Sequence, residues 1–499
     1  MPQTGTQTDI KVKPLSVSPT YNETIVVLDS PSKQSNNFKW LVDIYKGEST
    51  DTDYELISSL VILPNPQGYG VIDFHRHIEN YISTSFFPSD INKISSKVTN
   101  EGLKWSYEIT EKADNIKWRF EDNYTSAGSF VGFTSSTDKH PYVVGDVINI
   151  TQDSGATHSA YDGQSTITTI VDEYTILTDK TYLGSTPVEG GQSELEDKTS
   201  REIEQVLTAS DNVLYSFNGA LSFQDFRTWD SSEYELTNTS LNTTKFLSTQ
   251  KEIDITVNDR VWINSLLGST PFGLLEIETD NGVYLVGQTH TPTGQHFINQ
   301  NKIGYKDILE SLDTFTSIGN PLPPVDVNTT FIKITPKNST GSTVVGETIT
   351  LNIKDYCSKH EAIRFFYMGK FGEYLPLTFD RVSKRNINNT RSNYKQNYGS
   401  YDSVSNAWGY TTYDKGLTTY DISSKEVITC TSDWLNENQV SMVVDMLNSP
   451  NVYIQDSSNN YISVNITTNS YEVKKKVNEK LLNYTLSFEY SNTNTNQRG

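Results

Sequence analysis

The chain has 499 residues, more than one hydrophobic core usually serves, so its length predicts several domains. Its formal charge of −21 argues against specific nucleic-acid binding, because phosphate contacts need clustered Lys and Arg. Its two cysteines, Cys357 and Cys430, are too few for a disulfide framework or a thiolate zinc site, so we expect free thiols in a protein made in the cytoplasm. Neither a signal-peptide core nor a run of about 18 apolar residues indicates secretion or a membrane span. An aromatic share of 11% favours β-strands.

The N-terminal region reads as short strands between Ser-, Asn-, Gly- and Pro-rich turns, which is typical of a β-sandwich. Alternation is clearest where Trp105, Tyr107 and Ile109 would share one face of a strand. We predict a sandwich made of residues 1–128 and 200–243, because similar patterning resumes after a region of different texture.

That region of different texture, residues 129–199, is rich in Gly, Thr and Asp and contains several short strand patterns. It predicts a small SH3-like barrel inserted in the sandwich. The Glu-rich run 193–207 is expected to form a short helix or linker at the return point.

A second β domain is predicted over residues 244–320. Its firmest element is a hairpin at Asp280-Asn281-Gly282, because Asn-Gly tolerates the positive φ angles of a tight turn. The stretch from Gly319 to Pro324 contains three prolines and predicts an extended linker that ends the domain.

A third β domain is predicted over residues 321–424. It contains an irregular polar stretch, residues 383–415, whose length favours a binding loop or an arm that is ordered only in an assembly.

The last region, residues 425–499, predicts a helix packed on a small sheet. The helix would have Asp433 as its N-cap and would stop at Pro450. Its apolar stripe would consist of Val440, Val443, Val444 and Leu447. The fold class is therefore mainly β, with multidomain β-sandwiches, an inserted SH3-like barrel and a C-terminal α+β region.

Catalytic and metal motifs are weak in this sequence. His75 and His77 could offer two imidazoles from one face of a strand beside Asp73, but a third ligand is not evident. Cys357 lies near His360 and Glu361, which is weak evidence for a nucleophile. Paired carboxylates of a glycan depolymerase could be hidden among the 61 acidic residues, but none stands out. We predict no catalytic, cofactor-binding or metal-binding residues and no enzyme activity.

Six aromatic residues stand among polar ones near the predicted arm. They could be anchors of a protein interface, a sugar-stacking surface, or parts of a solvated loop. These candidate interface residues are Tyr398, Tyr401, Trp408, Tyr410, Tyr413 and Tyr420.

Four segments carry a family resemblance. They are residues 425–455 (KEVITCTSDWLNENQVSMVVDMLNSPNVYIQ), 385–396 (RNINNTRSNYKQ), 486–499 (LSFEYSNTNTNQRG) and 62–82 (ILPNPQGYGVIDFHRHIENYI). They resemble structural proteins encoded among the tail and neck genes of Bacteroidetes-infecting tailed phages, including the crAss-like podoviruses.

The resemblance implies a virion protein of the tail, made in the host cytoplasm and repeated in a ring, collar or baseplate-like layer. Its partners would be copies of itself and other tail, neck or portal-associated virion proteins, and it implies no cofactor. A receptor- or glycan-binding tail-tip protein is the alternative, and a glycan depolymerase is a third reading.

Overall fold

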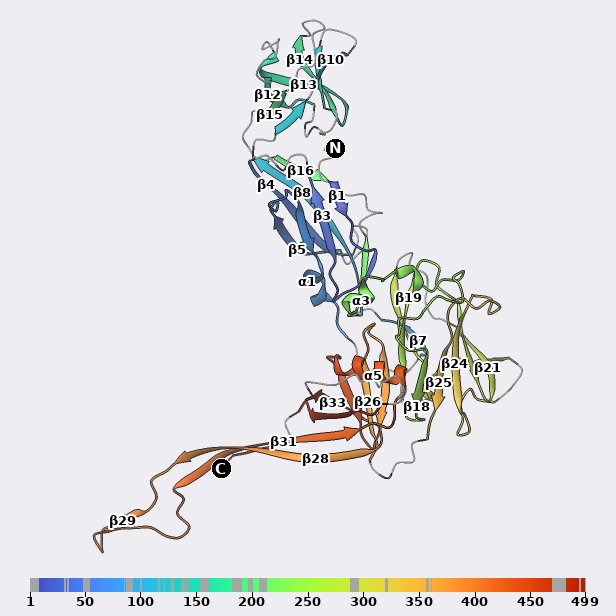
Figure 1. The fold of residues 1–499 in the computed structure, drawn as a ribbon, viewed down its shortest axis with the longest axis vertical. Coiled ribbons are helices and arrows are strands. Elements are labelled where there is room, and N and C mark those ends of the chain that lie inside the picture. The colour runs from blue at the N-terminus through green and yellow to red at the C-terminus, as the bar shows by residue number, and fades with distance from the viewer. Residues whose placement is uncertain are drawn as a thin grey trace. The chain divides into compact units, whose positions relative to one another are not determined.

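The computed structural model shows a mainly β protein with few helices (Figure 1). It describes residues 9–30, 33, 36–47, 54–84, 86, 93–98, 101–114, 117–120, 122–126, 130–135, 140, 142, 144–152, 161–181, 191–195, 201–205, 213–287, 296–318, 322–355, 359, 361–468, 482–492 and 495–498. The chain divides into two compact units. Unit 1 comprises Met1–Thr84 and Thr99–Arg227, and unit 2 comprises Ser85–Val98 and Thr228–Gly499.

Unit 1 contains a β-sandwich. One sheet has the strand order β1-β3-β6, and the other has the order β2-β17-β8-β4-β5, with β16 also paired to β8. The strands are β1 (Asp9–Val12), β2 (Val17–Pro19), β3 (Ile25–Asp29), β4 (Asn36–Lys46), β5 (Glu55–Ile62), β6 (Gly70–Asp73), β8 (Gly102–Asp114), β16 (Arg201–Gln205) and β17 (Leu214–Phe217). Short helices are α1 (His75–Ile78), η2 (Glu79–Tyr81) and α3 (Phe223–Phe226).

The core of the sandwich confirms the predicted alternation. Trp105, Tyr107 and Ile109 of β8 are all buried, and they pack in one cluster with apolar residues of β3 and β4 such as Leu28 and Trp40. Burial of these large side chains is the main favourable term for the sandwich.

A small, nearly closed barrel is inserted between β8 and β16. Its strand order is β10-β11-β14-β13-β12-β15-β9. The strands are β9 (Lys117–Phe120), β10 (Asp122–Ser126), β11 (Phe130–Thr134), β12 (Val147–Gln152), β13 (Gly163–Asp172), β14 (Thr175–Thr181) and β15 (Gly191–Leu195).

The barrel begins earlier in the chain than residue 129. Trp118 lies in the barrel's own core, with Phe120 and Phe133, and not in the core of the sandwich. The expected helix is wrong for the described parts of the Glu-rich run, because residues 193–195 belong to β15 and residues 201–205 to β16; residues 196–200 lie outside the described residues. Pairing of β15 with β9 and β12, and of β16 with β8, decides the conformation of these residues over their local preference.

Unit 2 is built on two large sheets. One has the order β18-β25-β24-β20-β21-β23, and the other runs β28-β31-β34-β33-β32-β26-β27-β19-β22-β7, with β35 also paired to β31. The strands are β7 (Ser95–Lys97), β18 (Glu252–Ile255), β19 (Trp262–Leu267), β20 (Leu274–Thr279), β21 (Gly282–Gly287), β22 (Phe297–Lys302), β23 (Thr316–Ile318), β24 (Phe331–Lys337), β25 (Ile349–Ile353), β26 (Ile363–Met368), β27 (Tyr374–Phe379), β28 (Val382–Lys395), β31 (Leu417–Thr431), β32 (Val452–Gln455), β33 (Tyr461–Ile466), β34 (Thr485–Tyr490) and β35 (Thr495–Arg498). A separate two-stranded sheet pairs β29 (Ser400–Asp402) with β30 (Ala407–Gly409), and the helices are η4 (Ser231–Glu233), α4 (Tyr305–Glu310) and α5 (Glu437–Leu447).

The predicted hairpin at Asn281-Gly282 is confirmed, because β20 and β21 pair directly with only Asp280 and Asn281 between them. The domain boundaries predicted near residues 320 and 424 do not separate domains in the structure. β20 pairs with β24 across the proline-rich stretch, and β26 pairs with β32 across the second boundary. One hydrophobic cluster includes residues from all three of the predicted C-terminal domains.

Helix α5 forms where a helix was expected, but its N-cap is Asn436 and not Asp433. The Asn436 side chain accepts a hydrogen bond from the Gln439 backbone N–H (2.9 Å), and the Gln439 side chain accepts one from the Asn436 backbone N–H (3.0 Å). The carboxylate of Asp433 instead accepts hydrogen bonds from Arg381. The buried face of the helix consists of Val440, Met442, Val443 and Met446, whereas Val444 and Leu447 are half-buried.

Candidate functional site

The polar stretch near residue 400 forms a regular structure instead of an irregular loop. All 14 residues of β28 have partners in β31, from Val382 opposite Thr431 to Lys395 opposite Leu417. Residues 382–431, here called the arm, therefore form a long β-ribbon with a small hairpin at its end, in which β28 is the outer strand and β31 the inner one (Figure 1).

The arm is anchored at one end only. At its base, Ile428 and Cys430 of β31 are buried, and β31 pairs with β34 from Val427 to Thr431. Farther along, β35 pairs with β31 from Asp421 to Ser424. No residue of β28 is buried, and the outer edge of β28 has no strand partner in the described part of the chain.

Two ion pairs lie at the base of the arm, one between the residues that flank it and one from β28 to Glu361. Arg381 donates to Asp433 (2.9 Å), and Arg385 donates to Glu361 (2.9 Å). Partial burial acts to raise the pKa of Asp433, but hydrogen bonds, including that from Arg381, bring this pKa below its ordinary value. Because these side chains are largely exposed, each pair contributes little stability.

The end of the arm is a compact hairpin. Tyr401 of β29 lies opposite Trp408 of β30, and Asp402 accepts hydrogen bonds from the Val404 backbone N–H (3.0 Å) and the Ser405 hydroxyl (2.7 Å). The Trp408 ring packs over Gly399, where a Cβ atom would lie only 2.6 Å from the indole nitrogen. This contact requires glycine at position 399, which also has a φ of +95°.

All six predicted aromatic residues are exposed, from 49% for Tyr420 to 80% for Tyr413. Five of them lie at or beside the terminal hairpin, and the rings of Tyr398 and Tyr410 contact each other at a centroid distance of 5.7 Å. Tyr420 lies back along the ribbon, where it meets Tyr394 at 6.0 Å. Tyr394 of β28 was not among the six predicted residues, although it too stands among polar residues.

The Asp73-His75-His77 segment does not form the expected strand with two histidines on one face. The strand ends at Asp73, and His75 and His77 lie in the short helix α1. The imidazole of His75 lies 2.7 Å from the carboxylate of Asp73. Burial acts to raise the pKa of Asp73, but hydrogen bonds from His75 and Thr24 lower it below its ordinary value.

The described residues show neither a metal-binding cluster nor a membrane-spanning helix. They contain no group of three or more His, Cys, Asp or Glu side chains arranged to hold a metal ion. Nor do they contain a helix that is long and apolar enough to cross a membrane. Cys357 and His360 lie outside the described residues, and Glu361 binds Arg385 at the base of the arm.

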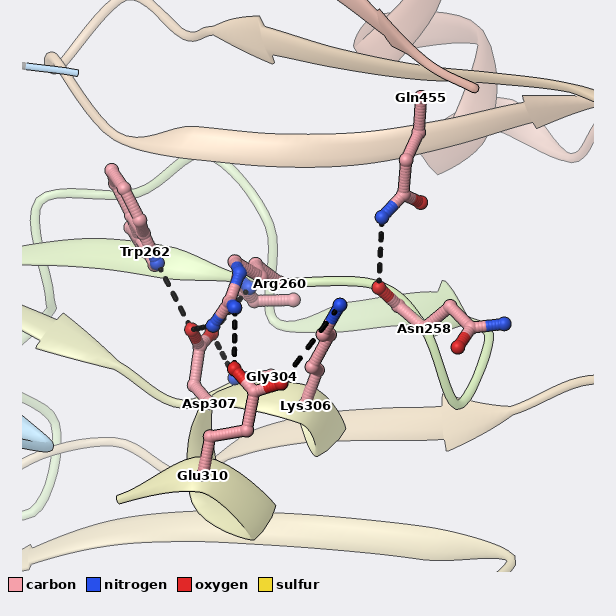
Figure 2. Close-up of polar contacts among 9 residues, drawn as sticks. Asn258, Arg260, Trp262, Gly304, Lys306, Asp307, Glu310 and Gln455 are labelled. Atoms are coloured by element: carbon pink, nitrogen blue, oxygen red, sulfur yellow. Dashed lines mark hydrogen bonds and ion pairs between the residues drawn. The ribbon is translucent and has the colours of Figure 1, made fainter. Parts of the chain in front are cut away.

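A buried charge cluster that the sequence did not reveal lies beside helix α4. Figure 2 shows the Asp307 carboxylate accepting hydrogen bonds from the Arg260 side chain (2.8 Å), the Trp262 indole (3.2 Å) and the Gly304 backbone N–H (3.1 Å). Arg260 also donates to Glu310 (2.6 Å). Burial raises the pKa of Asp307, and the Arg260 charge opposes that rise. The cluster fastens α4 to the start of β19, and of its charged groups Glu310 is exposed, whereas Arg260 and Asp307 are buried.

An open pocket of about 500 Å³ lies in unit 2, lined by residues that include Asn258, Thr330, Lys354 and Arg364. Arg364 is already engaged there, because its guanidinium donates to Asn459 (3.0 Å).

Comparisons with known proteins identify no family. No family model and no curated protein matches the chain. Among solved structures, a phage phi92 endosialidase aligns at 11% identity with a TM-score of 0.16, over 98% of this chain and 70% of that one. The plexin A4 extracellular region aligns at 6% identity with a TM-score of 0.13, over 98% of this chain and 43% of that one. Likenesses at this level carry no argument about function.

Proposed function

We propose that the chain is a structural subunit of a bacteriophage tail, and that it assembles into a ring or layer through its arm. The observation that carries this proposal is β28, a strand of 14 residues that has no buried residue and no strand partner on its outer edge in the described structure. Strands that lack a packed face are at best marginally stable in water. A partner surface would supply the missing cover.

The composition of the arm fits an interface. Tyr and Trp are the residue types that most often anchor protein contacts, since they bury a large area and keep a polar atom for hydrogen bonding. Here five exposed aromatic residues gather around one hairpin, together with Val404, which is 94% exposed. The family resemblance of residues 385–396 lies in β28 and supports the same reading.

Glycan binding by a tail-tip protein is the second candidate, because exposed aromatic rings also stack on sugars. Binding of the purified chain on a glycan array, lost in Trp408→Ala, would favour that candidate. Release of reducing sugar from a polysaccharide would instead favour a depolymerase.

A deletion of the outer arm tests the structural proposal. Residues 392–421 are replaced by Asn-Gly, which joins Arg391 to its register partner Ile422 and leaves the anchored base intact. Sedimentation velocity should show higher oligomers for the full chain at high concentration, and only monomers for the variant. Equal unfolding temperatures would show that the variant is folded. Assembly of the variant equal to that of the full chain would overturn the proposed role of the arm.

The tail location has its own test. Gold-labelled antibodies raised against this chain should bind the tails of phage particles that encode it. Labelling confined to phage heads would refute the tail location. Absence of labelling from disrupted particles, which expose all their proteins, would also refute it.

A further inference from the structure

Unit 1 has an open strand edge of unusual composition. Strand β5 ends its sheet, and β4 is its only strand partner among the described residues. Leu56 and Val61 of β5, and Leu63 just after it, are 50%, 60% and 66% exposed. The segment from Leu56 to Leu63 has no charged residue and no proline. Such an edge invites pairing with another chain, and proteins normally block it with charge, proline or a cover.

A repulsive pair of carboxylates lies on the same sheet. Asp43 of β4 is the register partner of Glu108 of β8, so two acidic side chains stand directly opposite each other. Like charges in this arrangement destabilise a sheet. Both side chains are half-buried on the face that also bears the stacked rings of Tyr45 and Tyr54. A cation brought by a partner would relieve the repulsion.

The net charge of unit 1 also favours a basic partner. It contains 31 Asp and Glu against 15 Lys and Arg, a formal charge of −16. A long-range field of this sign attracts a basic partner and speeds its approach.

The outer strand of the arm has the matching properties. β28 carries Lys384, Arg385, Arg391 and Lys395 and no acidic residue. Because alternate residues share a face, Ile387 lies between Arg385 and Arg391 on one side of the strand, and Ile387 is 68% exposed. This face offers an apolar contact flanked by Arg391 and by Arg385, whose guanidinium already pairs with Glu361 and Glu426. The edge of β28 is open along its length in the described structure.

We infer that β28 of one copy adds to the open edge of β5 in a second copy, so that the two sheets join in one intermolecular sheet. Backbone hydrogen bonds along the two edges would supply the pairing, as in other cases of strand addition. Ile387 would cover part of the exposed stripe of β5, and Arg391 would bring a cation to the sheet that bears the Asp43–Glu108 pair.

The two surfaces differ, so the contact is heterologous and repeats from copy to copy, which closes a ring when the rotation permits. This inference rests on the proposed role of the arm in assembly, and it names the edge of β5 as the surface that the arm binds.

Cross-linking of mixed variants tests the contact. Both native cysteines are replaced by Ala, and one preparation carries Ser59→Cys in β5 while the other carries Asn389→Cys in β28, on the face of Ile387. Each preparation has a different size tag. A short bismaleimide should join the two tags when the preparations are mixed. A third preparation with Ser342→Cys, an exposed residue of unit 2 away from both edges, is the matched control and should give no product.

The outcomes separate the two proposals. A mixed product that is lost in Asp43→Asn/Glu108→Gln, together with about tenfold weaker self-association, supports the inference. Cross-links formed only between two copies of the Ser59→Cys preparation would mean that β5 pairs with β5. That result would overturn the inference. Loss of assembly on deletion of the outer arm, without any β5–β28 product, would keep the arm's assembly role and reject this partner. Assembly that survives the deletion would reject both.

Discussion

Glu373 is a fully buried carboxyl group at the start of β27, in the turn that joins it to β26. It accepts hydrogen bonds from the backbone N–H groups of Phe371 (2.8 Å) and Thr249 (3.4 Å). Its side chain packs against Gly369, where a Cβ atom would lie 2.5 Å from the carboxyl carbon. Burial, and then the negative charge of Asp445 on helix α5, raise the pKa of Glu373 from 4.5 to about 7.

The direction of the pH effect follows from this shift. Because the folded protein holds the proton more tightly than the unfolded chain does, the contribution is most favourable below pH 4.5 and is lost as the pH rises through about 7. A rise from 4.5 to about 7 corresponds to a total of about 3 kcal/mol. About 2 kcal/mol of this loss falls between pH 5.5 and pH 8.

The substitution Glu373→Gln removes the titration and keeps the shape of the protonated side chain. Urea unfolding followed by tryptophan fluorescence should show that wild type loses about 2 kcal/mol more than the variant between pH 5.5 and pH 8. Glu252→Gln, which removes a charge from the exposed start of β18, is the control and should follow wild type. Equal pH dependence of wild type and Glu373→Gln would refute the reasoning.

Three further predictions concern the arm, the barrel and the histidines. Hydrogen exchange in the isolated subunit should be faster in residues 383–415 than in the buried strand β26 and should slow on assembly, because none of these residues is buried. Protection equal to that of β26 would contradict this. Replacement of residues 115–200 by a short Gly/Ser link should leave a folded, β-rich sandwich by circular dichroism. Ala113 and Arg201 are register partners, so the link is short, and the cores of the sandwich and the barrel are separate. An aggregated product would show that the two cores depend on each other. Elemental analysis should find no stoichiometric transition metal, because His75 and Asp73 bind each other and the described residues add no third ligand to them. About one zinc or iron per chain would refute this.

Local patterns predicted those parts of the fold that depend on neighbouring residues. The alternation of Trp105, Tyr107 and Ile109 identified a buried strand face, and Asn281-Gly282 identified a tight hairpin. Both signals work because side-chain direction and turn geometry depend on a few consecutive residues. The exposed aromatic residues of the arm were also found from the sequence, since they stand among polar residues.

Tertiary structure decided what depends on distant residues. The proline-rich stretch before residue 324 reads as a domain boundary, but strands on its two sides pair in one sheet. Asp433 has the right residue type for an N-cap, yet Arg381 binds it and Asn436 caps the helix. Arg260 and Asp307 lie 47 positions apart, and only the packing of α4 on β19 brings their charges together. No local pattern records such pairings, because β-sheet contacts and buried charges are selected by the free energy of the whole packed unit.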